Sequence, residues 1–261
     1  MIEICALASG SNGNCYYIGN ESEAILVDAG ISRRQVLERM KEKGLDASKI
    51  KGIFISHEHA DHFRGVRVLS KQLDVPVYIT AKALANSWGP NRPALIKHFI
   101  PGDCIEIGGF LIHSFLKQHD AAEPCSFRIE HDGINIGVMT DIGFPCDNVI
   151  EHFSACQAIF LESNYDEDML WNGPYPDYLK NRVVSDVGHL SNAQAVELLK
   201  SSGSENLEVV FLSHLSAENN TPQIALDAFQ ALSEKYDVRL TNRYAAAEVF
   251  RLEKKTVVVG C

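Results

Sequence analysis

The chain has 261 residues, of which 46% are hydrophobic, so it is long enough to bury a substantial core. Its formal net charge of −10 argues against an extended basic surface of the kind that holds duplex nucleic acid through many phosphates. The sequence contains neither an apolar run of about 18 residues nor a cationic leader followed by an apolar segment. We therefore expect neither export nor membrane insertion.

Nothing in the sequence marks a boundary between domains, because no low-complexity tract, charge block or Pro/Gly/Ser-rich linker interrupts it. We expect one domain over residues 1–261. The seven cysteines form an odd set without a C-x-x-C pair, which fits reduced thiols better than a disulfide framework. The expected location is therefore cytoplasmic, and none of the cysteines is expected to bind a metal.

Short apolar runs rich in Ile, Val and Phe alternate with helical patterns along the chain. In chain order, the sequence predicts a strand over 24–27, a helix over 32–43, strands over 53–56, 77–79, 134–139 and 158–161, a helix over 191–202, a strand over 209–212 and a helix that begins at 221. This alternation predicts an α/β fold in which helices cover the sheets.

The predicted helix ends rest on residues that favour those positions. Ser32 and Ser191 are good N-caps, and Gly44 and Gly203 follow the last turns of the two helices that they begin. Thr221 followed by proline favours the start of the third helix. That helix would place five residues on one face: Ala225, Ala228, Phe229, Leu232 and Tyr236.

Titratable residues follow four of the predicted strands. His57 comes after IFIS, Asp141 after GVMT, Glu162 after AIFL and His214 after VFLS. In layered α/β folds the loops at this edge of the sheet converge on a site, because the sheet interior has no room for water or charge. We expect these side chains to lie close together.

The hexapeptide His-Glu-His-Ala-Asp-His at 57–62 is the strongest signal. From the composition of this chain, three histidines and one aspartate at these offsets would occur by chance roughly once in a thousand such chains. Alternate residues of an extended segment point the same way, so His57 and His59 can share one ion. Asp61 and His62 would then turn toward an adjacent position, which makes two ions the expected number.

Imidazole and carboxylate ligands without a thiolate suit Zn²⁺, Mn²⁺ or Fe²⁺. We expect two divalent ions, zinc or manganese, with iron as a third possibility. Two ions that lie about 3.5–4 Å apart need a bridging anion. Asp141, in the segment MTDIG at the end of a predicted strand, is placed to supply one.

The order HxHxDH, a lone histidine at 119, Asp141 in a Thr-Asp context and His214 after a late strand resembles the metallo-β-lactamase superfamily over nearly the whole chain. This resemblance implies a four-layer αβ/βα sandwich. It also implies a dinuclear site with His57, His59 and His119 on one metal, Asp61, His62 and His214 on the other, and Asp141 between them. Asp28, in ILVDAG, would have a supporting role.

A narrower resemblance is carried by the segments ASGSNGNC, QHDAAEP, LESN, GHLSN and SHLSAENN. Together they resemble the bacterial YycJ/WalJ branch of the superfamily, whose members are described as DNA exonucleases. The segment GHLSNAQAVELL also resembles the His-containing segment of the RNase Z branch. By that analogy His189 would donate a proton to the leaving oxygen and Glu162 would orient its ring.

The expected catalytic residues are therefore Asp61, His189 and Glu162. A phosphodiester has a poor alkoxide leaving group, so a general acid favours this substrate class over a thioester. Two alternatives stay open: Glu162 can instead support a metal-bound histidine, and His189 can make only a local bond at a helix start. We leave Asp120 out, because adjacent residues on an extended chain point apart.

Two further segments have two interpretations each. Ser191 and the N–H groups that open its helix could hold a phosphate. The loop with Trp171, Tyr175 and Tyr178, close to Lys180 and Arg182, is either a stacking platform for single-stranded nucleic acid or a packed lid over the cleft.

Three functions are compatible with these features. The first is a dinuclear metal-dependent phosphodiester hydrolase, a DNA exonuclease that uses a metal-bridging hydroxide. The second keeps the site but takes a small phosphodiester such as a cyclic nucleotide, which suits the acidic composition. The third, in which the metals are structural and the protein only binds partners, conflicts with a ligand set that leaves open positions.

Overall fold

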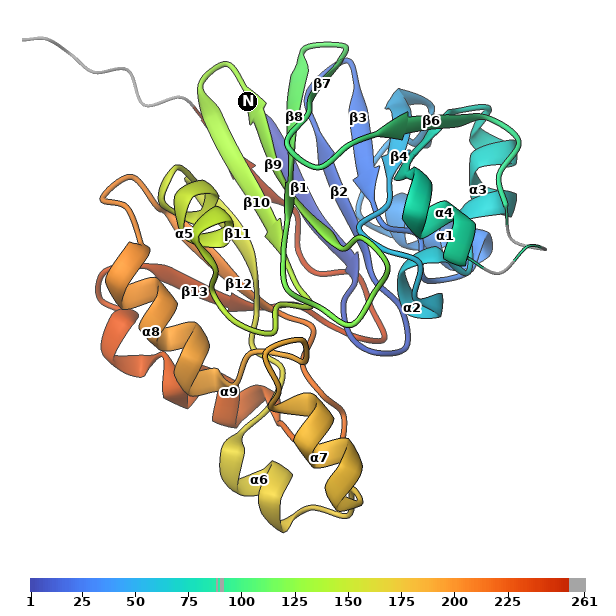
Figure 1. Cartoon of the computed structure of the whole chain (residues 1–261). Helices are drawn as coiled ribbons and strands as arrows, with labels where there is room; N and C mark the ends of the chain where they lie inside the picture. The colour runs from blue at the N-terminus through green and yellow to red at the C-terminus, as the bar shows by residue number, and fades with distance from the viewer. Residues whose placement is uncertain (88, 90–91, 254–261) are drawn as a thin grey trace, which may run out of the picture.

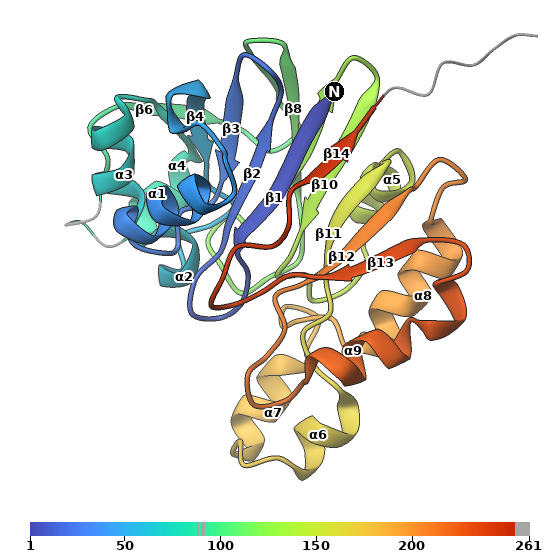
Figure 2. The ribbon, with the colours of Figure 1, turned by 180° about the vertical axis from the view of Figure 1, so that it is seen from behind.

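The computed structural model describes residues 1–87, 89 and 92–253, and within them two seven-stranded mixed sheets pack face to face (Figure 1). The first sheet has the strand order β14 (Phe250–Leu252), β1 (Ile2–Ala8), β2 (Cys15–Gly19), β3 (Ala24–Val27), β4 (Ile50–Phe54), β5 (Val77–Thr80) and β6 (Ile96–Phe99). The second has the order β13 (Asp237–Leu240), β12 (Val209–Ser213), β11 (Ala158–Glu162), β10 (Ile134–Met139), β9 (Cys125–His131), β8 (Phe110–Leu116) and β7 (Cys104–Ile107). Figure 2 shows β14 beside β1, with which it pairs antiparallel.

Helices cover the outer face of each sheet, which makes four layers. The first sheet is covered by α1 (Arg33–Glu42), α2 (Ala60–Phe63), α3 (Val66–Leu73) and α4 (Ala81–Asn86), and the second by α5 (Asp147–Ser154), α8 (Asn192–Ser202) and α9 (Pro222–Ala228). Two short helices, α6 (Glu167–Asn172) and α7 (Asp177–Val183), project beyond the end of the second sheet. The expected αβ/βα sandwich is confirmed.

Strand β11 shows why these sequences form buried strands. Its residues are buried on both faces: Phe160 packs between the sheets, where its ring lies 4.9 Å from that of Phe211, whereas Ile159 and Leu161 pack under the helices. Side chains of a strand alternate between its faces, so a strand covered on both sides is a continuous apolar run. The same argument explains why the predicted runs became central strands.

The predicted elements agree closely with the structure at their capped ends. Ser32 and Ser191 accept hydrogen bonds from the N–H groups of Gln35 and Gln194, and each pair forms a capping box. The strand predicted over 53–56 begins and ends earlier in the structure, where β4 spans Ile50–Phe54. The chain leaves the sheet early, and Ser56 instead bonds to Asp28.

The third predicted helix is wrong beyond its first turns. α9 ends at Ala228, and a short 3₁₀ turn over Gln230–Leu232 follows it. Ala228 is exposed, although Ala225, Phe229 and Tyr236 are buried as expected. The helix stops because the chain must turn back to bring β13 alongside β12, with which it pairs in parallel.

The carboxyl ends of parallel strands in both sheets meet at one edge. β3, β4 and β5 run parallel in the first sheet, and β10, β11 and β12 run parallel in the second. Three residues that follow these strands have left-handed backbones: Asp28 (φ 62°), Asp141 (φ 56°) and His214 (φ 56°). Asp, Asn and His tolerate this conformation better than branched residues do, and it turns the chain sharply at the sheet edge.

Candidate active site

The first cluster of histidines combines residues that follow strands of both sheets. His57 and His59 come from the extended segment between β4 and α2, and Nε2 of His57 lies 3.1 Å from Nδ1 of His59. The ring of His119, from the loop after β8, lies 5.0 Å from that of His57 and 5.2 Å from that of His59. One nitrogen from each ring falls within a sphere small enough for a single ion to contact all three.

A second cluster adjoins the first. Nε2 of His62 lies 3.4 Å from Oδ2 of Asp61, and the same carboxylate oxygen lies 3.5 Å from Nε2 of His214. The first two residues belong to the short helix α2, while His214 follows β12 in the other sheet. The hexapeptide therefore faces two positions, as its spacing predicts.

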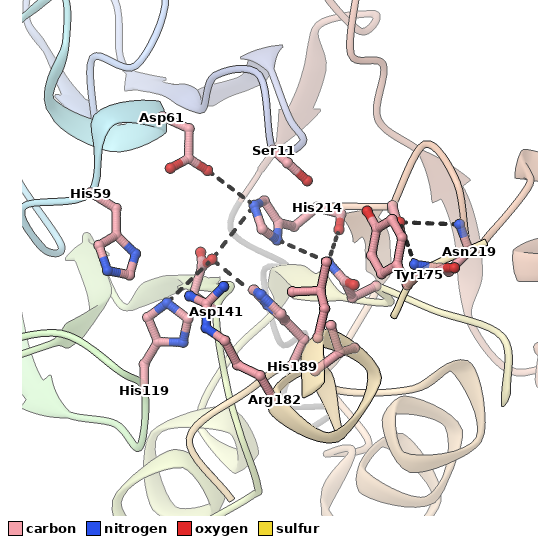
Figure 3. Close-up of a pocket in the computed structure, with 14 residues that line it drawn as sticks. Ser11, His59, Asp61, His119, Asp141, Tyr175, Arg182, His189, His214 and Asn219 are labelled. Carbon is pink, nitrogen blue, oxygen red and sulfur yellow. Dashed lines mark hydrogen bonds and ion pairs between the residues drawn. The ribbon is translucent and has the colours of Figure 1, made fainter. Parts of the chain in front are cut away.

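Asp141 lies between the two clusters (Figure 3). Its Oδ2 is 3.3 Å from Nε2 of His62, and its Oδ1 is 3.5 Å from Nε2 of His214 and 3.9 Å from Nε2 of His119. The side chain is 2% exposed. The structure thus brings all seven sequence-predicted ligand residues together: His57, His59, Asp61, His62, His119, Asp141 and His214.

Three of the clustered histidines, His62, His119 and His214, have a partner in the protein at Nδ1. Nδ1 of His62 is 2.7 Å from Oδ2 of Asp28, and Nδ1 of His119 is 3.1 Å from the carbonyl oxygen of Gly188. His214 uses Nδ1 in the same way toward Oε1 of Glu162, at 3.1 Å. A carboxylate or carbonyl at Nδ1 fixes the proton there, so the lone pair of Nε2 faces the centre.

Several buried polar atoms at this centre lack a hydrogen-bond partner among the described residues. They include Nε2 of His119, Nε2 of His214 and Oδ2 of Asp141. A buried polar atom without a partner is costly, and three of them in one site is unusual for a protein interior. His119 belongs to the first cluster, His214 to the second, and Asp141 lies between them, so ions held by the two clusters would satisfy these atoms. The donor set therefore fits the ions expected from the sequence.

The electrostatics of the site also favour a cation. Burial lowers the pKa of His214, because it disfavours the charged imidazolium. The carboxylates of Asp141, Asp61 and Glu162 raise this pKa by more, to about 10. His62 likewise has its pKa raised well above the usual value, against burial, by Asp141, Asp28 and Asp61. The carboxylates therefore attract positive charge to these rings, and a divalent ion can take the place of the protons.

Glu162 contacts two histidines at once. Its Oε1 lies 2.8 Å from Nδ1 of His189 and also close to Nδ1 of His214, and its Oε2 accepts hydrogen bonds from the N–H groups of Ile142 and Leu190. Burial disfavours its ionised form, yet the two histidines lower the pKa of Glu162 to about 2. The two interpretations of Glu162, orienting His189 and supporting a central histidine, are therefore compatible in this geometry.

His189 lies at the rim of the cleft. Its side chain is 18% exposed, its Nδ1 is held by Glu162, and its ring lies 5.3 Å from the rings of both His119 and His214. The cleft has a volume of about 230 Å³, and Ser11 from the polar loop between β1 and β2 lines it as well. Nε2 of His189 is thus available to a molecule bound there.

The prediction that Asp120 points away from His119 is wrong. Its Oδ1 lies 3.4 Å from Nε2 of His119, and its Oδ2 accepts a 2.6 Å hydrogen bond from Nε of Arg182. The rule of alternation holds for strands, whereas this segment is an irregular loop beyond the end of β8. Neighbouring side chains can therefore lie on the same side.

The phosphate role considered for Ser191 does not fit either. The residue is fully buried, its hydroxyl accepts the N–H of Gln194 and donates to Glu167, and no face of it reaches the cleft. The helix start is already satisfied by the capping box. Ser191 is therefore a structural cap.

The loop with the aromatic residues is largely a lid. Tyr175 is half-buried and lines the cleft, and Lys180 is buried with its Nζ donating to the carbonyl of Trp171. Trp171 and Tyr178 are exposed, at 49% and 76%, but do not line the cleft. The lid interpretation therefore fits Tyr175, and a stacking platform on the other two stays a prediction.

Sequence reasoning placed Asn14 only in a polar loop, residues 9–14, that could line the cleft, and it missed the contact of Asn14 with His62. Its Nδ2 lies 3.0 Å from Nε2 of His62, its backbone N–H donates to the carbonyl of Asp61, and its backbone carbonyl accepts the N–H of Gly30. A Cβ at Gly30 would stand 1.5 Å from the carbonyl oxygen of Asp61, so only glycine permits this approach. The only signal in the sequence was the polar loop in which Asn14 lies.

Replacing Asp28 by asparagine is expected to weaken metal binding by roughly 10- to 100-fold. Asp28 accepts the N–H and hydroxyl of Ser56 and the Nδ1 proton of His62 with its two oxygens, whereas asparagine offers only one acceptor. The His62 ring would then lose its fixed tautomer. Titration with a competing chelator measures the change. Asp74→Asn, at an exposed left-handed position, is the matched control, and equal affinities in both variants would contradict the expectation.

Comparison with protein families gives one match over most of the chain. Residues 23–214 match the family described as "Beta-lactamase superfamily domain". Within the residues that the structure describes, we find no helix of the length and apolarity that a membrane span requires.

Among curated proteins, the chain is 35% identical over 239 residues to "Exodeoxyribonuclease YycJ" of Bacillus anthracis, covering 90% of each chain. It is 33% identical to "Exodeoxyribonuclease WalJ" of Streptococcus pneumoniae, covering 84% of this chain and 83% of that protein. Among solved structures, the metallo-β-lactamase fold protein YhfI of Bacillus subtilis superposes with a TM-score of 0.72 at 17% identity, over 95% of this chain and 100% of that one.

Proposed function

Because the chain belongs to the metallo-β-lactamase superfamily, in the branch of the YycJ and WalJ proteins, we propose that it is a DNA exonuclease that hydrolyses phosphodiester bonds. Membership of this family makes it a metal-dependent hydrolase, which overturns the third, non-enzymatic alternative. The two named exodeoxyribonucleases match it over most of their length. The observation that carries the proposal is the pairing of the seven-residue cluster with a histidine–glutamate pair at the rim of the cleft.

We assign the seven-residue cluster to two divalent ions. The unpartnered buried atoms of His119, His214 and Asp141 support this assignment. When bound, two such ions would activate a water near neutral pH and neutralise charge on the phosphodiester. The nitrogen and oxygen donors suit zinc or manganese. One ion would be held by His57, His59 and His119, the other by Asp61, His62 and His214, with Asp141 contacting both.

Three residues would carry the catalytic steps that the ions do not supply. Asp61, 22% exposed in its side chain and facing the cleft, would orient the attacking water with a carboxylate oxygen. Glu162 would hold Nδ1–H of His189 and stabilise the ring when both nitrogens are protonated. Nε2–H of His189 would then donate its proton to the leaving alkoxide. This division gives each of the three expected catalytic residues a separate role.

A small phosphodiester is the second candidate substrate. The net charge of −10 and the presence of one permanently cationic side chain, Arg182, among the residues that line the cleft favour it. A cleft of about 230 Å³ is smaller than the pockets that enclose a whole drug-sized ligand. It can therefore take one end of a substrate, either a small diester or the terminus of a polymer.

The test is hydrolysis of end-labelled single- and double-stranded DNA by protein stripped of metal and reloaded separately with Zn²⁺ and Mn²⁺. Stepwise shortening that depends on the metal is the expected result. Intact DNA together with turnover of a cyclic nucleotide would move the assignment to the small substrate. Competition between oligonucleotides and small diesters for the same site distinguishes the two when both are cleaved.

A further inference from the structure

The cleft contains an arginine that the catalytic scheme above does not use. Arg182, near the end of α7, is the one lysine or arginine among the residues lining the cleft. Figure 3 shows its side chain among the labelled residues that line the cleft, which include His119, His189 and Asp141. A permanent positive charge at this place faces the same space as the candidate metal cluster and the candidate acid.

Two nearby lysines have structural contacts instead. Lys117 is 3% exposed and donates to the carbonyl of Thr140, and Lys180 is 7% exposed and donates to the carbonyl of Trp171. Neither lines the cleft. Arg182, by contrast, is 53% exposed in its side chain. A phosphate in the cleft would therefore meet Arg182 and neither lysine.

Asp120 holds Arg182 in this position. Its Oδ2 accepts from Nε and lies 2.5 Å from Nη2 of the guanidinium, and no hydrogen bond joins Nη1 of Arg182 to any of the described residues. The remaining N–H groups of the guanidinium can donate hydrogen bonds to a bound anion, in the planar geometry with which arginine binds phosphate oxygens. The backbone N–H of Asp120 donates to the carbonyl of Val187, two residues before His189. The loop of Asp120, α7 and the segment of His189 are therefore connected.

We propose that Arg182 binds the non-bridging oxygens of the phosphate that is cleaved, and that Asp120 is its positioning residue. The inference rests on the proposed phosphodiesterase function and deepens it, because it assigns substrate recognition to a side chain outside the metal cluster. It also places one permanent positive charge in the cleft of a protein whose net charge is −10. A neutral ester, lacking this charge, would gain little from Arg182.

The test compares metal-loaded full-length wild type with Arg182→Gln, Arg182→Lys and Asp120→Asn in DNA hydrolysis. Arg182→Gln is expected to lower kcat/KM by about 100-fold or more, as the loss of a donor to a developing charge does. Arg182→Lys should retain part of the activity, because it keeps the charge without the planar fork. Asp120→Asn should lower kcat/KM by less than Arg182→Gln does. The double variant should have the same kcat/KM as Arg182→Gln alone, because Asp120 acts only through the guanidinium of Arg182.

Two readouts separate this role from a structural one. The inhibition constant of inorganic phosphate should rise about tenfold in Arg182→Gln, which is the effect expected from the loss of one charge-assisted hydrogen bond. The bound metal per chain should stay at the wild-type value in every variant. Arg239→Gln is the matched control, because Arg239 also pairs with one aspartate oxygen through Nε and Nη2, on β13. It should leave both readouts unchanged.

The outcomes distinguish the two proposals. An active wild type with Arg182→Gln within threefold of it, or with unchanged inhibition by phosphate, would overturn the role of Arg182. Loss of a metal equivalent in Asp120→Asn would show that Asp120 is a ligand and overturn its positioning role. A wild type that leaves DNA intact but cleaves bis(p-nitrophenyl) phosphate would overturn the DNA assignment alone, and the same variants on that diester would still test Arg182.

Discussion

Asp141→Asn is expected to abolish metal-dependent DNA shortening, with a loss well above the roughly 100-fold that removal of an outer partner of a metal ligand causes. Asp141 has oxygens within 4 Å of His119 in the first cluster and of His62 and His214 in the second, and one of these oxygens has no hydrogen-bond partner among the described residues. Asparagine keeps the volume and tolerates the left-handed backbone at φ 56°, but removes the charge. Activity on end-labelled DNA and metal content by mass spectrometry measure the effect.

Asp132→Asn is the matched control for this substitution. Asp132 also has a left-handed backbone, at φ 50°, but it is exposed in the turn between β9 and β10. The control should keep full activity and metal content. If Asp141→Asn bound two ions with wild-type affinity and shortened DNA at a similar rate, the assignment of Asp141 between the two ions would have to be abandoned.

His189→Ala is expected to lower kcat on DNA by roughly 100- to 10,000-fold, the usual contribution of a positioned general acid. The ring is held at Nδ1 by Glu162 and leaves Nε2 to the cleft. The loss should shrink on bis(p-nitrophenyl) phosphate, because its leaving group departs without a proton. Comparing the two substrates therefore separates proton donation from general damage to the site.

His98→Ala serves as the control for histidine removal. His98 is exposed on β6, and its ring lies within hydrogen-bond distance of the carbonyl of Ile79, away from the cleft. Circular dichroism should show intact folding for both variants. An equal loss on DNA and on the activated diester would argue against proton donation by His189, and unchanged turnover on DNA would remove it from the mechanism.

The sequence predicted the central strands and the capped helices well because their determinants are local. A run such as AIFL can be stable only where both faces are covered, and a serine three residues before glutamine satisfies a helix start without distant partners. Prediction failed where contacts between segments far apart in the sequence, and not the local pattern, determined where an element ends. The helix after Thr221 is shorter than its apolar spacing suggests, because β13 must pair with β12.

The sequence by itself determined the composition and grouping of the candidate site. The hexapeptide at 57–62 and the residues after successive apolar runs had to meet, because parallel strands end at one sheet edge. Only the tertiary structure decided how the remaining groups meet: Asn14 beside His62, Asp120 beside Arg182, and one oxygen of Glu162 shared by two rings. These contacts join residues that are 27 to 62 positions apart in the chain, with at least one partner of the Asn14 and Asp120 contacts in an irregular loop. Loop conformation depends on packing against the rest of the protein and leaves no periodic trace in the sequence.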